Sequence, residues 1–473
     1  MSTINLTLLH TNDLHGRVAR LARIGTLVRQ ARDEISAKGG YCLYLDAGDS
    51  EDSILLESAL TQGSAMEAVL RGAGCDQVAL GNAIPFRYGI QAIEGLAESF
   101  GKSLLCANMF WKDGSRPKGL TPYVIEDFGA FSLGIIGLTA PMDPYRIFKV
   151  DVLQPEEVAP ALIEQVKAEG ADFVMVLSHL GLKSDIRLAE KVEGISVIIG
   201  GHSHDRLKMP LAINNTLIVM AGELGEILGR LDLKIDSENF SVNHFFERHV
   251  VVTEQTPEYG PALEVMAVEK QRAQRIMDVE VGRLATTCDF STEFECRAGN
   301  LLADALLDHF SGADGAFVMG NHWEEGLPVG VITKGQIFSA NRSTGNPGKV
   351  LLTGSQLKQF FAAALNPENI HRSMAVLRGQ SPGFPHIAGM QVRATGEGSD
   401  RWEILLGDRV VKDDDTLTMV TSDLELSEYL DYLVIPDEQV EYDIPTILPE
   451  VVEGYLRRHN PLGEVCVGRI KTD

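Results

Sequence analysis

Short apolar runs alternate with amphipathic segments through the first half of the chain. Between several of the runs, residues 20–39 and 155–170 repeat apolar positions at helical spacing. The runs themselves are rich in β-branched and aliphatic residues, have the length of buried strands, and cover residues 4–10, 41–48, 77–82, 103–109, 131–139, 172–180 and 195–202. This alternation predicts an α/β fold with a buried, layered sheet.

The pattern changes after about residue 250, which predicts a second domain. Residues 257–278 have helical spacing and no strand signal, so we expect a connecting helix in a linker over 251–279. From residue 280, the amphipathic segment 299–310 precedes short strands separated by Gly, Pro and Asn turns. We therefore predict domains at 1–250 and 280–473, with the joining helix as a hinge.

Side chains that bind metals follow the ends of the predicted strands, where open α/β sheets place their ligands. Seven such residues occur in five fragments: Asp13, His15, Asp49, Asn82, His179, His202 and His204. The pairs Asp13/His15 and His202/His204 are two positions apart, and in an extended segment such pairs project to the same side. Mixed oxygen and imidazole ligands without cysteine favour Zn, Mn, Fe, Co or Ni over Mg or Ca.

The order of these fragments, D-x-H, G-D, G-N, S-H and G-H-x-H, resembles the calcineurin-like metallophosphoesterases. The opening LLHTNDLHG and the later ECRAGNLLADALL are similar to the branch that contains 5'-nucleotidases, 2',3'-cyclic nucleotide phosphodiesterases and UDP-sugar hydrolases. The resemblance covers nearly the whole chain. It implies an N-terminal four-layer αββα sandwich and a C-terminal α+β domain that selects the substrate.

Carried over residue by residue, the resemblance implies a centre with two divalent metal ions. The ligand sets are Asp13, His15 and His204 for one ion and Asn82, His179 and His202 for the other, with Asp49 bridging them. Such a pair activates water for attack on a phosphoryl group. We therefore expect hydrolysis of a phosphoester, of a nucleotide or related small molecule, in nucleotide catabolism. His10 lies inside a predicted strand and is expected to be structural.

The segment LGNAIPFRYG departs from the family at a catalytic position. In the family, the residue after the metal-binding Asn is a His that belongs to a catalytic His-Asp pair. This chain has Ala83 at that position. Loss of such an acid or base typically costs on the order of 10²- to 10⁴-fold in rate. Because the ligands are complete, we expect Asn82 still to serve catalysis. Arg87 either contacts a phosphate oxygen or is a solvated loop residue.

The second domain departs from the family where relatives recognise the nucleotide. Met319 and Glu324 stand near the Asn and Arg of the family's segment, and Leu424 replaces one of two aromatic rings. Phe384, in PGFPHIAG, either stacks on a base or belongs to the core. Asn346 either contacts substrate or forms a turn.

His322 and Trp323 are unusual residues in the same substrate-facing segment. We expect them to define the ligand of this chain. His322 would supply the lost proton donor if the two domains close, a hypothesis that His322→Ala tests.

The formal net charge of −24 argues against a nucleic-acid polymer or an anionic membrane surface as partner. Bound metal ions would reverse the charge locally and admit a small phosphorylated substrate. The chain shows no signal-peptide pattern and no apolar run long enough for a membrane span. Its six cysteines are scattered without a C-x-x-C pair, so we expect reduced thiols in the cytoplasm.

Two alternatives to a nucleotide phosphatase remain open from the sequence. The first is a phosphodiesterase that acts on cyclic nucleotides or other diesters. The second is a non-catalytic binding protein that has kept its metal site, which fits the loss of an imidazole, an Arg and one aromatic ring.

Overall fold

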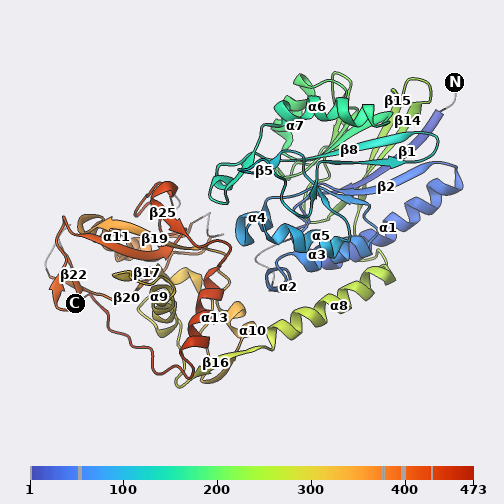
Figure 1. Ribbon diagram of the computed structural model, residues 1–473. Coiled ribbons are helices and arrows are strands. Elements are labelled where there is room, and N and C mark those ends of the chain that lie inside the picture. Colours follow the sequence, from blue (N-terminus) through green and yellow to red (C-terminus); the bar gives the residue numbers. More distant parts are fainter. Residues whose placement is uncertain are drawn as a thin grey trace. The chain divides into compact units, whose positions relative to one another are not determined.

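The computed structural model describes residues 3–51, 56–374, 377, 379–395, 401–427 and 430–472. The chain forms two compact units, Met1–Ala273 and Gln274–Asp473. The helix predicted over 257–278 is present as α8, Gly260–Met277, which crosses from one unit into the other (Figure 1). Its role as a hinge stays a prediction.

Unit 1 contains two main sheets. In the first, of order β15-β14-β1-β2-β3, the last three strands are parallel and the first two are antiparallel additions. Its strands are β1 (Thr3–Thr11), β2 (Tyr41–Asp46), β3 (Gln77–Val78), β14 (Ile227–Asp236) and β15 (Val242–Val251). The second has the order β12-β13-β11-β10-β8-β7. Its strands are β7 (Tyr123–Asp127), β8 (Ser132–Thr139), β10 (Phe173–His179), β11 (Val197–Gly200), β12 (Leu211–Ile213) and β13 (Thr216–Val219).

The two sheets pack face to face, because alternate residues of their strands are apolar and buried between them. Leu6 and Leu8 of β1 meet Met175 and Leu177 of β10 in this central core. On the other face of the second sheet, alternate apolar residues pack under α6 (Pro155–Ala168) and α7 (Leu182–Lys191). Alternate residues of β10 therefore contribute to two separate cores, one on each face of the second sheet.

Helices cover both outer faces. The helices α1 (Val18–Ala37), α3 (Ser64–Gly72) and α5 (Ala92–Phe100) lie on the side of the first sheet, opposite α6 and α7 (Figure 1). Residues buried in α1 repeat at helical spacing, and they include Leu21, Ile24 and Val28. This arrangement is the αββα layering that the resemblance implies.

Two predicted strands are wrong in their extent, and of residues 77–82 only Gln77–Val78 form a strand, β3. Residues 103–109 do not form a continuous strand but two short ones, β4 (Leu104–Leu105) and β5 (Met109–Trp111). The interruption has a clear cause, because the buried side chain of Asn108 donates to the carbonyl oxygens of Thr139 and Leu153 at 2.8 and 2.9 Å. These bonds hold the segment in a bend, and apolar character alone does not reveal it.

Unit 2 is built on a five-stranded sheet of order β20-β17-β24-β19-β25. The strands are β17 (Gly315–Met319), β19 (Pro347–Thr353), β20 (Pro385–Ala388), β24 (Thr416–Ser422) and β25 (Val440–Tyr442). A four-stranded sheet adds β21 (Gln391–Ala394), β22 (Trp402–Leu406), β23 (Arg409–Val410) and β26 (Ile470–Lys471), and a two-stranded one pairs β16 (Glu280–Leu284) with β18 (Gly330–Thr333). The helices are α9 (Arg297–His309), α10 (Lys334–Ala340), α11 (Gly354–Ala364), α12 (Pro367–Ile370) and α13 (Leu448–Arg458).

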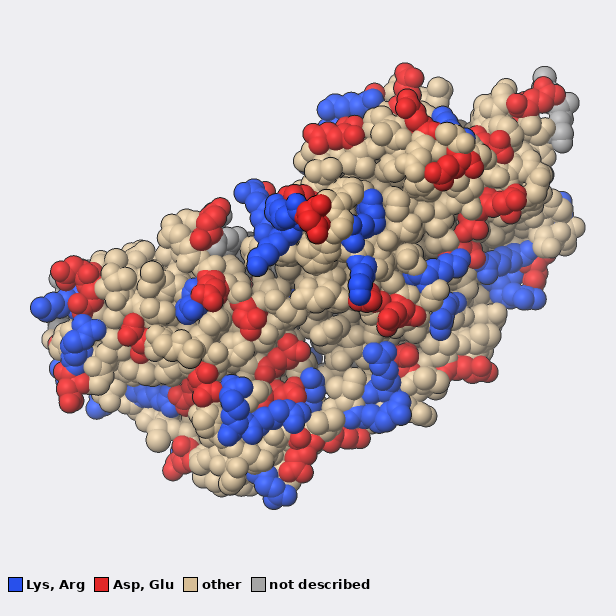
Figure 2. All heavy atoms as spheres, in the orientation of Figure 1, with Lys and Arg blue, Asp and Glu red and all other residues tan. Residues whose placement is uncertain are grey.

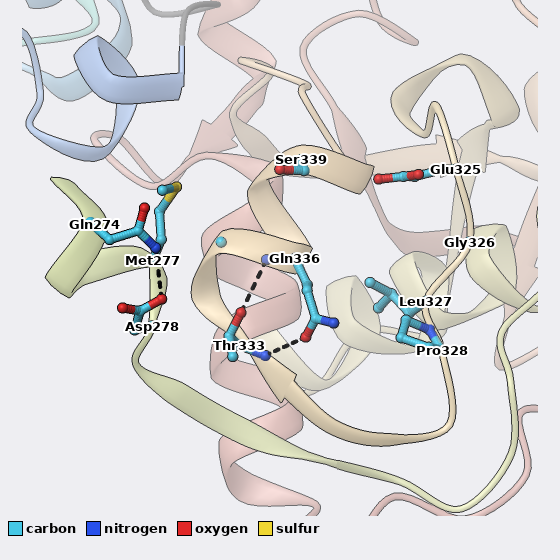
Figure 3. Close-up of a pocket in the computed structure, with 11 residues that line it drawn as sticks. Gln274, Met277, Asp278, Glu325, Gly326, Leu327, Pro328, Thr333, Gln336 and Ser339 are labelled. Atoms are coloured by element: carbon cyan, nitrogen blue, oxygen red, sulfur yellow. Dashed lines mark hydrogen bonds between the residues drawn. The ribbon is translucent and has the colours of Figure 1, made fainter. Parts of the chain in front are cut away.

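The predicted amphipathic helix over 299–310 is confirmed as α9, and the mixture of strands and helices agrees with an α+β domain. A cavity of about 460 Å³ lies between the end of α8 and the start of α10, where Thr333 and Gln336 cap that helix reciprocally (Figure 3). Among the residues described as lining it are the acidic Asp278 and Glu325. None of the four substrate-binding candidates is among those lining residues.

Acidic and basic side chains are interspersed over the face of the molecule in Figure 2. Among the described residues, all six cysteines are free thiols, and four of them are buried. No helix in the described ranges combines the length and the apolar character that crossing a lipid bilayer requires.

Candidate metal centre

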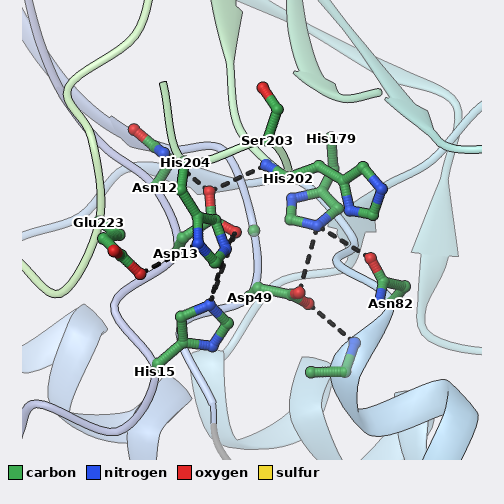
Figure 4. A network of polar contacts seen from close by, with 12 residues as sticks. Asn12, Asp13, His15, Asp49, Asn82, His179, His202, Ser203, His204 and Glu223 are labelled. Atoms are coloured by element: carbon green, nitrogen blue, oxygen red, sulfur yellow. Dashed lines mark hydrogen bonds and ion pairs between the residues drawn. The ribbon is translucent and has the colours of Figure 1, made fainter. Parts of the chain in front are cut away.

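The parallel strands of unit 1 bring the predicted ligands to one edge. Asp13 follows β1, Asp49 follows β2 and Asn82 follows β3, while His179 ends β10 and the loop after β11 carries His202 and His204. Strands β1, β2 and β3 are neighbours, as are β10 and β11. Because parallel strands end at the same edge of a sheet, their loops converge (Figure 4).

The backbone of these loops corrects one sequence argument. The side chains of Asp13 and His15 do not project together from an extended segment, since β1 ends at Thr11. Both residues have left-handed backbone, with φ of 51° and 44°, and His202 and His204 have φ of 75° and 57°. Such conformations cost on the order of 1–3 kcal/mol each and cluster at functional sites. A left-handed turn therefore brings His15 toward Asp13. The left-handed residues His202 and His204 reach different groups, His202 beside His179 and His204 beside Asp13.

The first group of ligand atoms joins Asp13, His15 and His204. His204 Nε2 lies 3.3 Å from Asp13 Oδ1, and His15 Nε2 lies 3.8 Å from the same oxygen. The two Nε2 atoms are 3.2 Å apart. The three ligand atoms are close enough to share one ion, which is the set that the resemblance implies for the first metal.

The second group centres on Asp49 and His179. His179 Nε2 lies 3.3 Å from Asp49 Oδ2 and 3.2 Å from Asn82 Oδ1. The ring of His202 is next to that of His179, with centroids 5.1 Å apart. Asp13, Asp49 and His179 also present ligand atoms within reach of one another. The two groups are thus contiguous through their carboxylates (Figure 4).

Hydrogen bonds orient the imidazoles. His179 Nδ1 lies 2.8 Å from the carbonyl oxygen of Ala47, and since a carbonyl only accepts, Nδ1 carries the proton. When this imidazole is neutral, as a metal ligand must be, its lone pair is on Nε2, which faces Asp49 and Asn82. The backbone N–H of His202 donates to Asp13 Oδ2 at 2.9 Å and fixes that carboxylate.

The site concentrates buried negative charge. Asp13 and Asp49 are 0% and 5% exposed. Burial alone would raise the pKa of Asp49, but the charge of His179 and its hydrogen bond outweigh burial and lower the pKa to about 2. Asp13 Oδ1 is buried and has no hydrogen-bond donor among the described residues. A divalent cation would satisfy both carboxylates, so the residues present fit the metal ions that the family resemblance implies.

The surroundings of Ala83 show how Asp49 is held at the position where the family has an imidazole. Ala83 begins the short helix α4 (Ala83–Tyr88), and its backbone N–H donates to Asp49 Oδ1 at 2.8 Å. Gly81 is required nearby, because a Cβ there would lie 2.0 Å from Asp49 Oδ1. Arg87 lies one turn later on α4 and is partly buried. The backbone thus still supports Asp49, although the side chain at position 83 has no acid or base.

In unit 2, the predicted substrate residues are engaged in internal contacts. His322 is buried, with Nδ1 2.7 Å from Ser343 Oγ and Nε2 2.9 Å from Glu425 Oε1. Both ring nitrogens are therefore occupied, and the geometry gives the proton-donor hypothesis no support. Asn346 donates to the carbonyl oxygen of Thr446 at 2.7 Å.

The two aromatic candidates of unit 2 are also buried. Trp323 is 2% exposed and Phe384 is 8% exposed. Phe384 packs with Phe317 and Met319 in the main core of the unit. In this structure neither ring offers a broad open face for stacking.

Two residues near the ligands have no counterpart in the sequence prediction. The side chain of Asn12 donates to Asp13 Oδ2 at 2.7 Å and accepts from the backbone N–H of Ala221 at 3.1 Å. Glu223 Oε2 lies 3.0 Å from His204 Nδ1. Asn12 is adjacent to a predicted ligand, which is the signal that points to it, whereas Glu223 sits in a loop and carries no such signal.

Comparison with known proteins gives one family model and several relatives. Residues 277–427 match the model described as 5'-nucleotidase, C-terminal domain. An uncharacterized metallophosphoesterase, YunD of Bacillus subtilis (strain 168), is 28% identical over 82% of this chain and 84% of its own length. The 5'-nucleotidase of Bos taurus is 25% identical over 98% of this chain and 90% of its own.

Two solved structures share the fold over the whole chain. The 5'-nucleotidase precursor from Thermus thermophilus has a TM-score of 0.57 at 24% identity and covers 99% of each chain. The NAD nucleotidase NadN of Haemophilus influenzae has a TM-score of 0.64 at 16% identity and covers 100% of each. The predicted α/β fold with two domains is confirmed by this likeness.

Proposed function

We propose that this chain hydrolyses the phosphoester of a small, nucleotide-like molecule. It is homologous to 5'-nucleotidases and metallophosphoesterases, and it carries a 5'-nucleotidase C-terminal domain. Two divalent metal ions, held by the seven residues of unit 1, are the proposed cofactors. The observation that carries the proposal is the meeting of Asp13, Asp49 and His179, from three different strand ends, with ligand atoms close enough to share ions.

The residues of this chain have different roles in the proposed reaction. When bound, the two ions supply the Lewis acidity that activates a water molecule and stabilises charge on the phosphoryl oxygens. Asp49, between the two ligand groups, is proposed to bridge them. The carbonyl oxygen of Ala47 holds His179 with Nε2 directed at the centre. Imidazole and oxygen ligands together support Mn, Zn, Fe, Co or Ni as the ions.

Ala83 limits which leaving groups the proposed reaction can expel. A methyl group donates no proton to a leaving group, so esters whose leaving group departs without protonation should react best. We therefore propose a difference in substrate preference between this chain and Ala83→His. The ratio of aryl phosphate turnover to nucleoside 5'-monophosphate turnover should be higher for the parent chain than for Ala83→His, in which an imidazole is restored. Arg87 remains the proposed contact to a phosphate oxygen.

A metal-supplemented hydrolysis screen tests the proposal. The purified protein is assayed with Mn, Zn or Co against nucleoside 5'-monophosphates, cyclic nucleotides, UDP-sugars and aryl mono- and diesters. We expect Asp49→Ala to abolish hydrolysis, because it removes the proposed bridge, and Ala83→His to raise turnover of the monophosphates by up to about 10²-fold. Asp33→Ala, which removes a carboxylate exposed on α1, is the matched control and should change nothing.

The same screen separates the alternatives. Hydrolysis of diesters alone would make the protein a phosphodiesterase. Absence of hydrolysis with every ester and metal would contradict the enzyme assignment and favour the binding protein that keeps a metal site.

The substrate and its cellular location complete the proposal. Relatives named 5'-nucleotidase support a small nucleotide as the partner, and the net charge of −24 opposes a nucleic-acid polymer. The six free thiols support a reducing compartment, which we propose is the cytoplasm.

A further inference from the structure

Glu223 contacts a predicted metal ligand from outside the ligand set. Its Oε2 lies 3.0 Å from His204 Nδ1, on the side of the imidazole away from Asp13 and His15 (Figure 4). A carboxylate only accepts, so this contact places the proton of a neutral His204 on Nδ1. The lone pair is then on Nε2, the atom that lies 3.3 Å from Asp13 Oδ1.

The loop that carries Glu223 is fixed to the segment that carries Asp13. The backbone N–H of Ala221 donates to Asn12 Oδ1 at 3.1 Å, and Asn12 Nδ2 donates to the carbonyl oxygen of Gly222. On the other side of Glu223, the N–H of Leu224 donates to the carbonyl oxygen of Asp13 at 2.8 Å. The residues on both sides of Glu223 are thus held by Asn12 and by Asp13, a ligand of the first group.

The backbone at the next residue is consistent with a constrained turn. Leu224 has φ of 60°, a left-handed conformation that is rare for a branched residue. Its carbonyl oxygen accepts from Arg20 at 2.9 Å. Contacts on both the N–H and the C=O of Leu224 therefore hold this turn in addition to the ion pair of Glu223 with His204.

From this arrangement we propose that Glu223 is a positioning residue for the first metal ion. It acts through His204, whose tautomer and ring orientation it fixes before the ion binds. The inference rests on the proposed dimetal centre. A carboxylate that accepts from the far nitrogen of a ligating imidazole also makes the ligand more basic, and loss of such a partner typically costs 10- to 100-fold in metal affinity.

A purely structural role predicts something different. Side chains of Glu223 and His204 are 43% and 39% exposed, and exposed ion pairs contribute little to folding. The positioning role therefore predicts weaker metal binding with an unchanged melting temperature of the metal-free protein. A structural role predicts a lower melting temperature and no selective change in affinity.

Calorimetric titration of the metal-free 473-residue chain with Mn²⁺ tests the proposal. We expect Glu223→Ala to weaken one of two binding steps 10- to 100-fold and to leave the other within about twofold. Glu223→Gln should weaken that step less, because the amide oxygen still accepts from Nδ1–H. The matched control is Glu226→Ala, which removes the same charge from the same loop at a residue that faces Arg20 at 3.7 Å.

A spectroscopic readout accompanies the titration. With Co²⁺ in place of Mn²⁺, the visible spectrum of Glu223→Ala should differ from that of the parent, whereas the spectrum of Glu226→Ala should not. Equal affinities and spectra for the two alanine variants would overturn the proposal. If the parent binds no Mn²⁺ or Co²⁺, the proposed centre itself fails and this inference falls with it. If the parent binds these ions and Glu223→Ala changes neither affinity nor spectrum, only the inference about Glu223 is refuted, and the proposed metal centre stands.

Discussion

A single glycine shows how tightly the buried polar residues of unit 1 are packed. Gly229 of β14 is paired with His10 of β1, and a Cβ at Gly229 would lie 2.2 Å from the His10 ring. That ring is fully buried, and its Nε2 lies 3.2 Å from Glu247 Oε1. His10 therefore has the structural role expected of a strand residue.

We predict that Gly229→Ala destabilises the protein by about 1–3 kcal/mol, since the added methyl group forces the imidazole away from its carboxylate partner. Urea denaturation measures the free energy of unfolding. The matched control is Gly95→Ala in α5, where a Cβ meets no atom within 4 Å and alanine favours the helix. If both variants were equally stable, the packing argument at His10 would be refuted.

Between elements, the start of α9 is joined to β20 through a buried histidine. His386 Nε2 accepts from the backbone N–H of Cys296, the residue before α9, at 3.1 Å. Burial, with a smaller contribution from the charge of Arg469, lowers the pKa of His386 to about 3. The folded protein thus keeps this imidazole neutral, as the hydrogen bond requires.

This depressed pKa predicts a pH dependence with a definite sign. An unfolded chain binds a proton at His386 below about pH 6.5, whereas the folded chain does so only near pH 3. The contribution to stability is therefore complete above about pH 6.5 and is lost as the pH falls toward 3. Between pH 7 and pH 5 we expect the parent to lose about 1–2 kcal/mol more unfolding free energy than His386→Gln. The exposed His371→Gln should follow the parent, and parallel curves for the parent and His386→Gln would contradict the argument.

The sequence predicts elements better than the contacts that end or join them. Strands such as 172–180 follow from apolar runs, because burial selects those residues. The break at Asn108 depends on carbonyl groups far along the chain, and the left-handed turn at His204 depends on the ligand loop as a whole. Glu223 is a polar loop residue with no periodic signal, so only the folded chain reveals its contact with His204.

At the scale of the whole molecule, every predicted metal ligand lies in unit 1. Ions that bind only the folded state suppress local opening by the factor 1 + [ion]/Kd. This factor is about 100-fold when the ion concentration is 100 times Kd. We predict that chelation speeds hydrogen exchange in peptides covering 11–16, 47–51, 177–181 and 200–205, and leaves peptides of unit 2 unchanged. Mass spectrometry measures both in one sample. Asp49→Ala should abolish the response to chelation, and a uniform change over both units would argue against a localised centre.

The central claim is that seven side chains from five strand ends hold a pair of metal ions. Anomalous diffraction from crystals grown with Mn²⁺ tests it most directly. The account predicts two peaks about 3.5–4 Å apart, one beside Asp13, His15 and His204 and the other beside His179, with Asp49 between them. Mn²⁺ bound elsewhere, or no peak at this edge of the sheets, would contradict it.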